Sequence, residues 1–194
     1  MQERVKGTRR KATPVPAFES APVSTTKGHR IVLGVDPSLR GTGYGVIELV
    51  KGRPRFVAAG TIHCPATWER SRCLALIAQS LRDLLRQQPA TVCAMEGLFY
   101  AQNLQTAIIM GEARGAALAA VAEAGLEIYE LAPRKVKQAI VGYGAAQKLA
   151  VAKMVQRVLA LAELPAPDAA DALALALAFA QEQGRYALSP PKRV

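Results

Sequence analysis

The sequence feature that most limits the possible folds is a set of four acidic residues in apolar or glycine-containing surroundings. They are Asp36, Glu96, Asp168 and Asp171. The first ends the apolar run 31–35, the second ends the run 91–95, and the last two open a segment made almost entirely of alanine and leucine. Buried acids are costly unless they are paired, protonated or bound to a cation. On a chain of net charge +10, they indicate a divalent metal site that faces a polyanion.

Length and charge divide the chain into a core and two basic ends. A chain of 194 residues that is 51% hydrophobic has the size and composition of one globular domain. We expect a basic, disordered tail over 1–29, a domain over 30–184 and a basic tail over 185–194, because seven Lys or Arg face two Glu in the first thirty residues and the last ten residues contain no acid. A basic chain favours nucleic acid or an anionic membrane as partner. With no apolar run near the ~18 residues that span a bilayer, we expect a cytoplasmic protein that does not enter the membrane.

Hydrophobic periodicity predicts a mixed α/β fold. Apolar or alternating runs bounded by turn residues predict strands at 31–35, 41–50, 55–63, 91–95 and 126–131. Helical spacing predicts helices at 68–87, 103–123, 145–162 and 168–183, with Asn103 as an N-cap. A basic, glycine-containing loop is expected in between, with Arg134, Lys135, Lys137, residues 142–144 and Lys148. The order implies an antiparallel meander that leads into parallel strands, flanked by helices.

This arrangement can bring the four acids together. Acids that end internal strands lie at the edge of a sheet where open α/β folds place their ligands. Asp168 and Asp171 are three residues apart on a helix and therefore share a face. Carboxylates suit Mg²⁺ or Mn²⁺, and such a cluster can hold two ions ~3.5–4 Å apart. Singly, Asp36 could be a turn residue before proline and Asp168 a helix cap, whereas Glu96 and Asp171 are harder to explain in structural terms.

Four ordered segments carry a resemblance to a known family. They are Leu33-Gly34-Val35-Asp36-Pro37 with residues 42–47, Glu96-Gly97-Leu98-Phe99 through Asn103 to Gly111-Glu112-Ala113-Arg114-Gly115, Val136-Lys137-Gln138 with Val141-Gly142 and Lys148, and Asp168-Ala169-Ala170-Asp171-Ala172-Leu173-Ala174. Over roughly residues 30–181 the chain resembles RuvC-type Holliday junction resolvases, which have the RNase H-like fold. One departure is Ser38, where the family usually has glycine after Asp-Pro.

The resemblance implies roles for these residues. Asp36, Glu96, Asp168 and Asp171 would be catalytic acids that bind Mg²⁺ or Mn²⁺, two ions per site, and hydrolysis would leave 5′-phosphate and 3′-hydroxyl ends. Phe99 matches an aromatic that stacks on an unpaired base at the junction, and Tyr100 could assist it, whereas the residues taken alone favour core aromatics. Lys137 and Lys148 match positions that contact DNA in the family. For Arg134 and Lys135 a solvated loop competes with DNA contact, and Arg114 could contact phosphate or pair within its helix.

Partners follow from the same resemblance. The substrate would be four-way junction DNA, cut in recombination and repair by a homodimer whose symmetry matches that of the junction. Gly111 and Gly115 are candidates for close contact between helices. Branch-migration proteins of the RuvAB type would deliver the enzyme.

Two other functions remain open from the residues. A phosphotransferase of the actin and sugar-kinase type shares the sheet and a similar Gly-x-Asp start, but it needs two domains and a longer chain. A non-catalytic junction-binding module would have no reason to keep four acids opposite phosphate.

Overall fold

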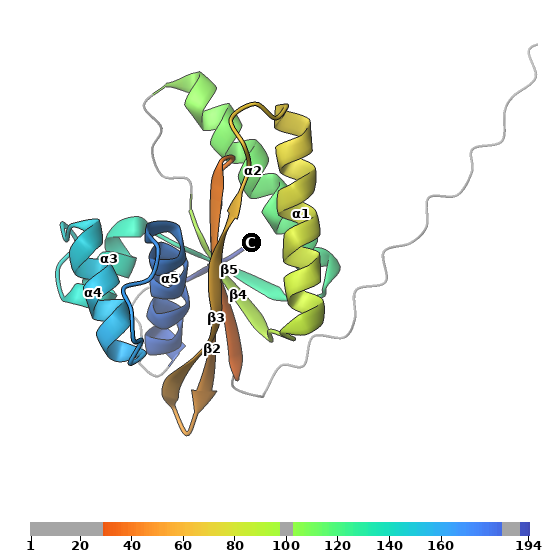
Figure 1. Ribbon diagram of the computed structural model, residues 1–194. Helices are drawn as coiled ribbons and strands as arrows, with labels where there is room; N and C mark the ends of the chain where they lie inside the picture. Colours follow the sequence, from red (N-terminus) through yellow and green to blue (C-terminus); the bar gives the residue numbers. More distant parts are fainter. Residues whose placement is uncertain (1–28, 98–102, 184–190) are drawn as a thin grey trace, which may run out of the picture.

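The computed structural model describes residues 29–97, 103–183 and 191–194, which form one mixed sheet with helices on both faces (Figure 1). The strands are β1 (Ile31–Asp36), β2 (Gly41–Val50), β3 (Arg53–His63), β4 (Val92–Glu96), β5 (Glu127–Leu131) and β6 (Lys192–Arg193). The helices are α1 (Arg70–Gln87), α2 (Leu104–Glu123), α3 (Pro133–Val141), α4 (Lys148–Val158) and α5 (Pro167–Gln183). The strand order is β3-β2-β1-β4-β5-β6. Pairing is antiparallel from β1 to β3, parallel for β1–β4 and β4–β5, and antiparallel again for β5–β6. The predicted meander followed by parallel strands is therefore confirmed.

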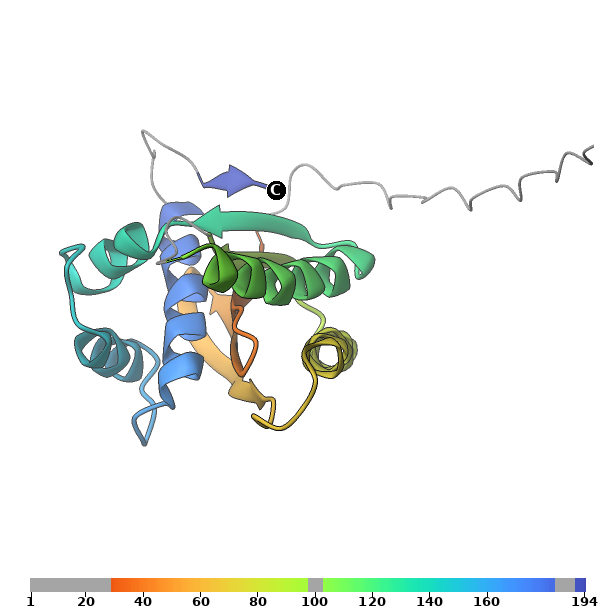
Figure 2. The same cartoon turned by 90° about the horizontal axis from the view of Figure 1, so that it is seen from above.

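The helices divide into two layers around the sheet (Figures 1 and 2). Helices α1 and α2 cover one face, where Leu33, Val35 and Ile77 belong to one buried cluster. Helix α5 lies on the other face, with α3 and α4 outside it. Because successive strand residues alternate between faces, Val32 and Gly34 of β1 face α5 while Leu33 and Val35 face the other layer.

Helix α5 lies unusually close to the sheet because glycines face it. A Cβ added to Gly34 of β1 would overlap the carbonyl oxygen of Ala172 and lie 2.9 Å from the amide nitrogen of Ala176. A Cβ at Gly43 of β2 would overlap the carbonyl of Asp168 in the same way. Glycine is thus required at these positions for the helix backbone to approach the strands. The approach places the acidic start of α5 beside the end of β1.

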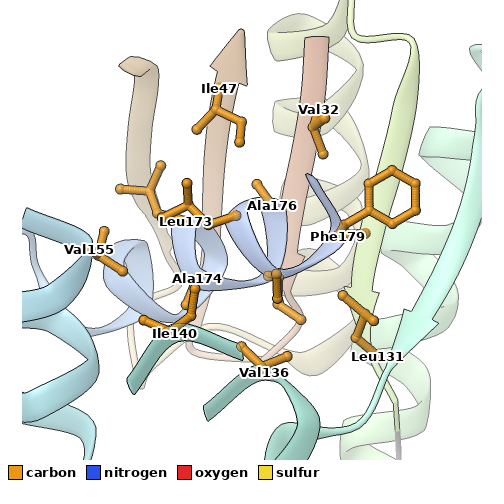
Figure 3. Packing of buried hydrophobic residues seen from close by; sticks show 14 of the residues in the cluster. Val32, Ile47, Leu131, Val136, Ile140, Val155, Leu173, Ala174, Ala176 and Phe179 are labelled. Carbon is orange, nitrogen blue, oxygen red and sulfur yellow. The ribbon is translucent and has the colours of Figure 1, made fainter. Parts of the chain in front are cut away.

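Further along α5, larger side chains fill the space between helix and sheet. Leu173 and Phe179 are almost completely buried, and they pack with Val32 and Ile47 in one cluster (Figure 3). The Phe179 ring also packs against Tyr129 of β5, with 5.0 Å between ring centroids. This packing holds α5 along its length and fixes the position of its N-terminal turn.

Turns agree with local residue chemistry. The β2–β3 hairpin turns at Lys51 and Gly52, both with positive φ, which matches the twist of the flanking strands. After β1, the buried Thr42 hydroxyl donates to the Ser38 carbonyl and accepts from the Ser38 amide, so backbone groups of Ser38 secure the turn that follows Asp36. At α2, the Asn103 side chain accepts a hydrogen bond from the Thr106 amide, which confirms the predicted N-cap.

The prediction of a basic loop around Arg134 to Lys137 is wrong. These residues form helix α3, with Pro133 in its first turn and Gly142 ending it at a φ of 95°. Val136 and Ile140 are buried four residues apart on the face towards α5, and this burial outweighs the polar residues between them. Helix α4 is also shorter than the predicted 145–162, and strand β6 was not predicted.

Some predicted features lie outside the described residues, namely residues 1–28 of the N-terminal tail, Phe99 and Tyr100, and residues 184–190 of the C-terminal segment. Within the part of the chain that is described, none of the helices combines the length and the apolar character needed to cross a membrane.

Candidate active site

Two of the predicted acids meet at the ends of neighbouring parallel strands. Asp36 is the last residue of β1 and Glu96 the last residue of β4. The preceding residues, Val35 and Met95, are register partners, so the two acids leave the sheet side by side. Their carboxyl groups lie close enough that each influences the pKa of the other.

The other two acids come from the N-terminal part of helix α5, which packs on one face of the sheet. Asp171 lies one turn into the helix and lines the same pocket as Asp36 and Glu96. Asp168 lies in the first turn and is not among the residues that line the pocket, although its charge acts on Asp36. One of its carboxylate oxygens would lie 2.8 Å from a Cβ added to Gly41 at the start of β2. The helix dipole stabilises acids placed in this first turn.

The pocket has a volume of about 240 Å³ and combines acids, two lysines and an apolar wall. Its lining consists of Asp36, Glu96, Pro133, Val136, Lys137, Lys148, Val151, Asp171, Ala174 and Leu175. The apolar side chains come from α3, α4 and α5. They exclude water from one side of the acids and so strengthen the electrostatic interactions there.

This environment disfavours charge on the two strand-end acids. Burial raises the pKa of Asp36, and the charges of Asp171 and Asp168 raise it further. Burial and the neighbouring Asp36 raise the pKa of Glu96 to about 8. Acids that repel one another in a partly dry pocket are stabilised by a cation placed among them.

Lysines supply positive charge at the pocket. The ammonium group of Lys148, at the start of α4, lies 2.6 Å from a carboxylate oxygen of Asp171. This hydrogen bond raises the pKa of Lys148, whose side chain remains 71% exposed. Lys137 reaches the pocket from α3. Both lysines therefore lie where an anionic substrate would approach the acids.

The donor set fits a hard divalent cation. Carboxylate oxygens are the ligands that Mg²⁺ and Mn²⁺ prefer, whereas no histidine or cysteine lines the pocket. In the described parts of the chain, no three acid, histidine or cysteine side chains surround a single point closely enough to form a metal site. The carboxylate of Asp171 accepts a hydrogen bond from Lys148. Binding of a cation through Asp171 therefore requires this carboxylate to exchange Lys148 for the ion.

Most of the predicted site residues meet in this pocket. Asp36, Glu96, Asp171, Lys137 and Lys148 line it, whereas Asp168 does not. The apolar wall was not predicted as part of the site. Its signal in the sequence is the four-residue spacing of Val136 and Ile140, which marks one face of a short helix that packs on α5.

Comparison with known proteins agrees with this geometry. The family model described as "Crossover junction endodeoxyribonuclease RuvC" matches residues 32–179. A protein of that name from Bordetella parapertussis is 44% identical over 149 residues, which cover 77% of this chain and 82% of the relative. One from Akkermansia muciniphila is 46% identical over 146 residues, or 75% of this chain and 87% of the relative.

Solved structures are also similar. The structure titled "T. thermophilus RuvC in complex with Holliday junction substrate" aligns with a TM-score of 0.76 and 31% identity, covering 86% of this chain and all of that one. The yeast mitochondrial Holliday junction resolvase Ydc2 aligns with a TM-score of 0.57 at 13% identity, which shows a shared fold.

Proposed function

Because the chain belongs to the RuvC family of crossover junction endodeoxyribonucleases, we propose that the pocket at the ends of β1 and β4 is where it cleaves DNA. The protein is a nuclease that resolves four-way Holliday junctions in recombination and repair, and it depends on divalent metal. The observation that carries the placement of the site is the convergence of Asp36, Glu96 and Asp171, from three separate elements, on one pocket that also holds Lys137 and Lys148.

Asp36, Glu96, Asp168 and Asp171 would hold the metal, as Mg²⁺ or Mn²⁺ and as two ions per site. Bound there, the ions supply Lewis-acid stabilisation of charge on the phosphate and lower the pKa of water. The support for this is the donor set, together with the electrostatic cost of keeping these acids near one another without a cation.

The residues around the acids bind and orient the DNA. Lys148 and Lys137 attract the scissile phosphate to the mouth of the pocket, and the exposed Lys148 is free to turn from Asp171 towards phosphate. The apolar wall excludes water on the opposite side of the acids. Hydrolysis leaves 5′-phosphate and 3′-hydroxyl ends. Phe99 stacks on a base near the junction with help from Tyr100, and such stacking is worth ~1–3 kcal/mol per base.

The working form is a homodimer. Two symmetric nicks need two pockets related by the two-fold symmetry of the junction. Gly115 on α2 is exposed, and a Cβ added to it would meet nothing within 4 Å in this chain, so a helix of a second copy can approach there. Branch-migration proteins of the RuvAB type would deliver this dimer to junctions.

The test of the site is Asp36→Asn, which keeps the size of the side chain but removes a metal-binding charge. We expect this variant to lose cleavage of a four-way junction in Mg²⁺ or Mn²⁺ while binding the junction as the wild type does. Gel-shift binding and mapping of nicks on four-way and linear DNA measure both properties. Wild-type cleavage by Asp36→Asn, purified free of the natural protein, would show that the catalytic site lies elsewhere.

A further inference from the structure

The guanidinium group of Arg114 connects helix α2 with strands β4 and β5 at the end of β4, where Glu96 enters the pocket. From α2, its Nε donates to the backbone carbonyl of Glu96 at 3.3 Å. Its Nη2 lies 3.3 Å from a carboxylate oxygen of Glu130 on β5. The side chains of Arg114 and Glu130 are each only 15% exposed. One partly buried ion pair thus connects α2 and β5 to the last residue of β4.

The hydrogen bond from Arg114 is made at the C-terminal end of β4. One residue past the end of β4, the amide of Gly97 donates a hydrogen bond to the carbonyl of Leu131 of β5 at 3.1 Å. The peptide unit that joins Glu96 to Gly97 therefore donates its N–H to β5 and accepts at its carbonyl from Arg114. A hydrogen bond to the Glu96 carbonyl restricts rotation of this peptide unit and therefore the direction of the Glu96 side chain.

We propose that Arg114 is a positioning residue that holds Glu96 in the orientation needed to bind metal. The proposal rests on the proposed function of the pocket, because it assigns Arg114 a role only through Glu96. Groups that orient a metal-binding carboxylate typically change metal affinity or activity about 10- to 100-fold when they are removed.

A direct contact between Arg114 and DNA is the competing role. Arg114 differs from Lys148 in two respects that count against it: its side chain is far less exposed, and its guanidinium already contacts two groups of the protein. A residue that binds phosphate would need to give up the Glu130 carboxylate, which is partly buried and would then have only the exposed Lys192, at 3.9 Å, as a cationic partner.

The chain offers variants that separate positioning from simple stability. Arg114→Gln removes both contacts and leaves the partly buried Glu130 with only the exposed Lys192 at 3.9 Å, so it is expected to destabilise the fold as well as the site. In the double variant Arg114→Gln with Glu130→Gln, the poorly compensated charge is removed and stability should largely return, but the hydrogen bond to the Glu96 carbonyl is still missing. Lys192→Gln is the control, because Lys192 is the other partner of Glu130, at 3.9 Å and 78% exposed.

The experiment measures Mn²⁺ binding by calorimetry on the full chain, in parallel with junction binding without metal and single-turnover cleavage at saturating junction. We expect the double variant to bind Mn²⁺ about 10- to 100-fold more weakly and to cleave more slowly. Its affinity for the junction should be unchanged, and Lys192→Gln should resemble the wild type in every assay. Arg114→Lys, which keeps the charge and one donor group, should recover part of the lost affinity.

Two results would overturn the proposal while leaving the site itself in place. The first is a folded double variant with wild-type Mn²⁺ affinity and cleavage. The second is weaker junction binding with a smaller salt dependence and unchanged Mn²⁺ affinity, which would identify Arg114 as a phosphate contact. Asp36→Asn in the same titration tests whether the pocket binds metal at all. If this variant binds Mn²⁺ as tightly as the wild type, the pocket is not the metal site and both proposals fail.

Discussion

The close approach of α5 to β1 predicts that a single methyl group at Gly34 will disable cleavage. In Gly34→Ala, the added Cβ would lie 2.9 Å from the Ala176 nitrogen, whereas ordinary contacts begin at 3.4 Å. The helix must therefore move away by about 0.5 Å at Ala176, and by more at Ala172, where the Cβ overlaps the carbonyl oxygen. Asp171 immediately precedes Ala172, so the displacement is largest next to the site.

Two magnitudes follow from this displacement. Overpacking of a core typically costs about 1–3 kcal/mol of the free energy of unfolding. Misplacing a catalytic group by ~1 Å can reduce a rate about 10²-fold, so a shift of this size should slow cleavage by one to two orders of magnitude. Binding of the junction, which depends on surface charges, should change little.

The assay combines urea unfolding with single-turnover cleavage of a four-way junction. Ile77→Val is a control for stability, because Ile77 is completely buried on α1, on the opposite face of the sheet, and this truncation typically costs about 0.5–1.5 kcal/mol. It should be less stable yet cleave normally. If folded Gly34→Ala cleaved at the wild-type rate, the approach of α5 would not determine the position of Asp171, and the reasoning would be wrong.

Two further predictions concern the DNA and the outer strands. Phe99→Ala should bind metal and junction but cleave slowly, because base stacking is lost, and normal cleavage in the same assay would return Phe99 to a role in the core. Glu48 is hydrogen-bonded to Arg55 and Arg30, which lower the pKa of its carboxyl group below its usual value of 4.5. Its contribution to stability is therefore present at neutral pH and lost as the pH falls through the lowered pKa. Urea unfolding should show Glu48→Gln to be less stable than the wild type at neutral pH, with a difference that shrinks in acid; a difference independent of pH would contradict this.

Features of the fold that are local in sequence could be predicted. The strand that ends in Asp36 and the one that ends in Glu96 are continuous apolar runs, which indicate internal strands. The Asn103 cap depends on residues three positions apart. For α3, however, the glycines and basic residues suggested a loop, and the burial of Val136 and Ile140 against α5 was decisive. Such burial depends on an element that begins 26 residues after the end of α3.

Features that depend on distant pairings could not be predicted. Strand β6 consists of two residues, Lys192 and Arg193, and exists through pairing with Tyr129 and Glu130. The role of Arg114 has the same origin, since its partners lie eighteen residues before it and sixteen after it. From the sequence, a contact with phosphate or with an acid on the same helix was the natural expectation.

The distribution of the acids over the fold explains why the site depends on the whole sheet. Asp36 and Glu96 are held by adjacent parallel strands, so their separation is set by backbone pairing. Asp171 has no such constraint: its distance from them depends on how closely α5 packs, and hence on Gly34 and on the core contacts of Leu173. The strand pair and the helix are therefore positioned by different interactions. Changes in core packing under α5 should consequently alter cleavage before they unfold the protein, whereas comparable changes under α1 should affect stability first.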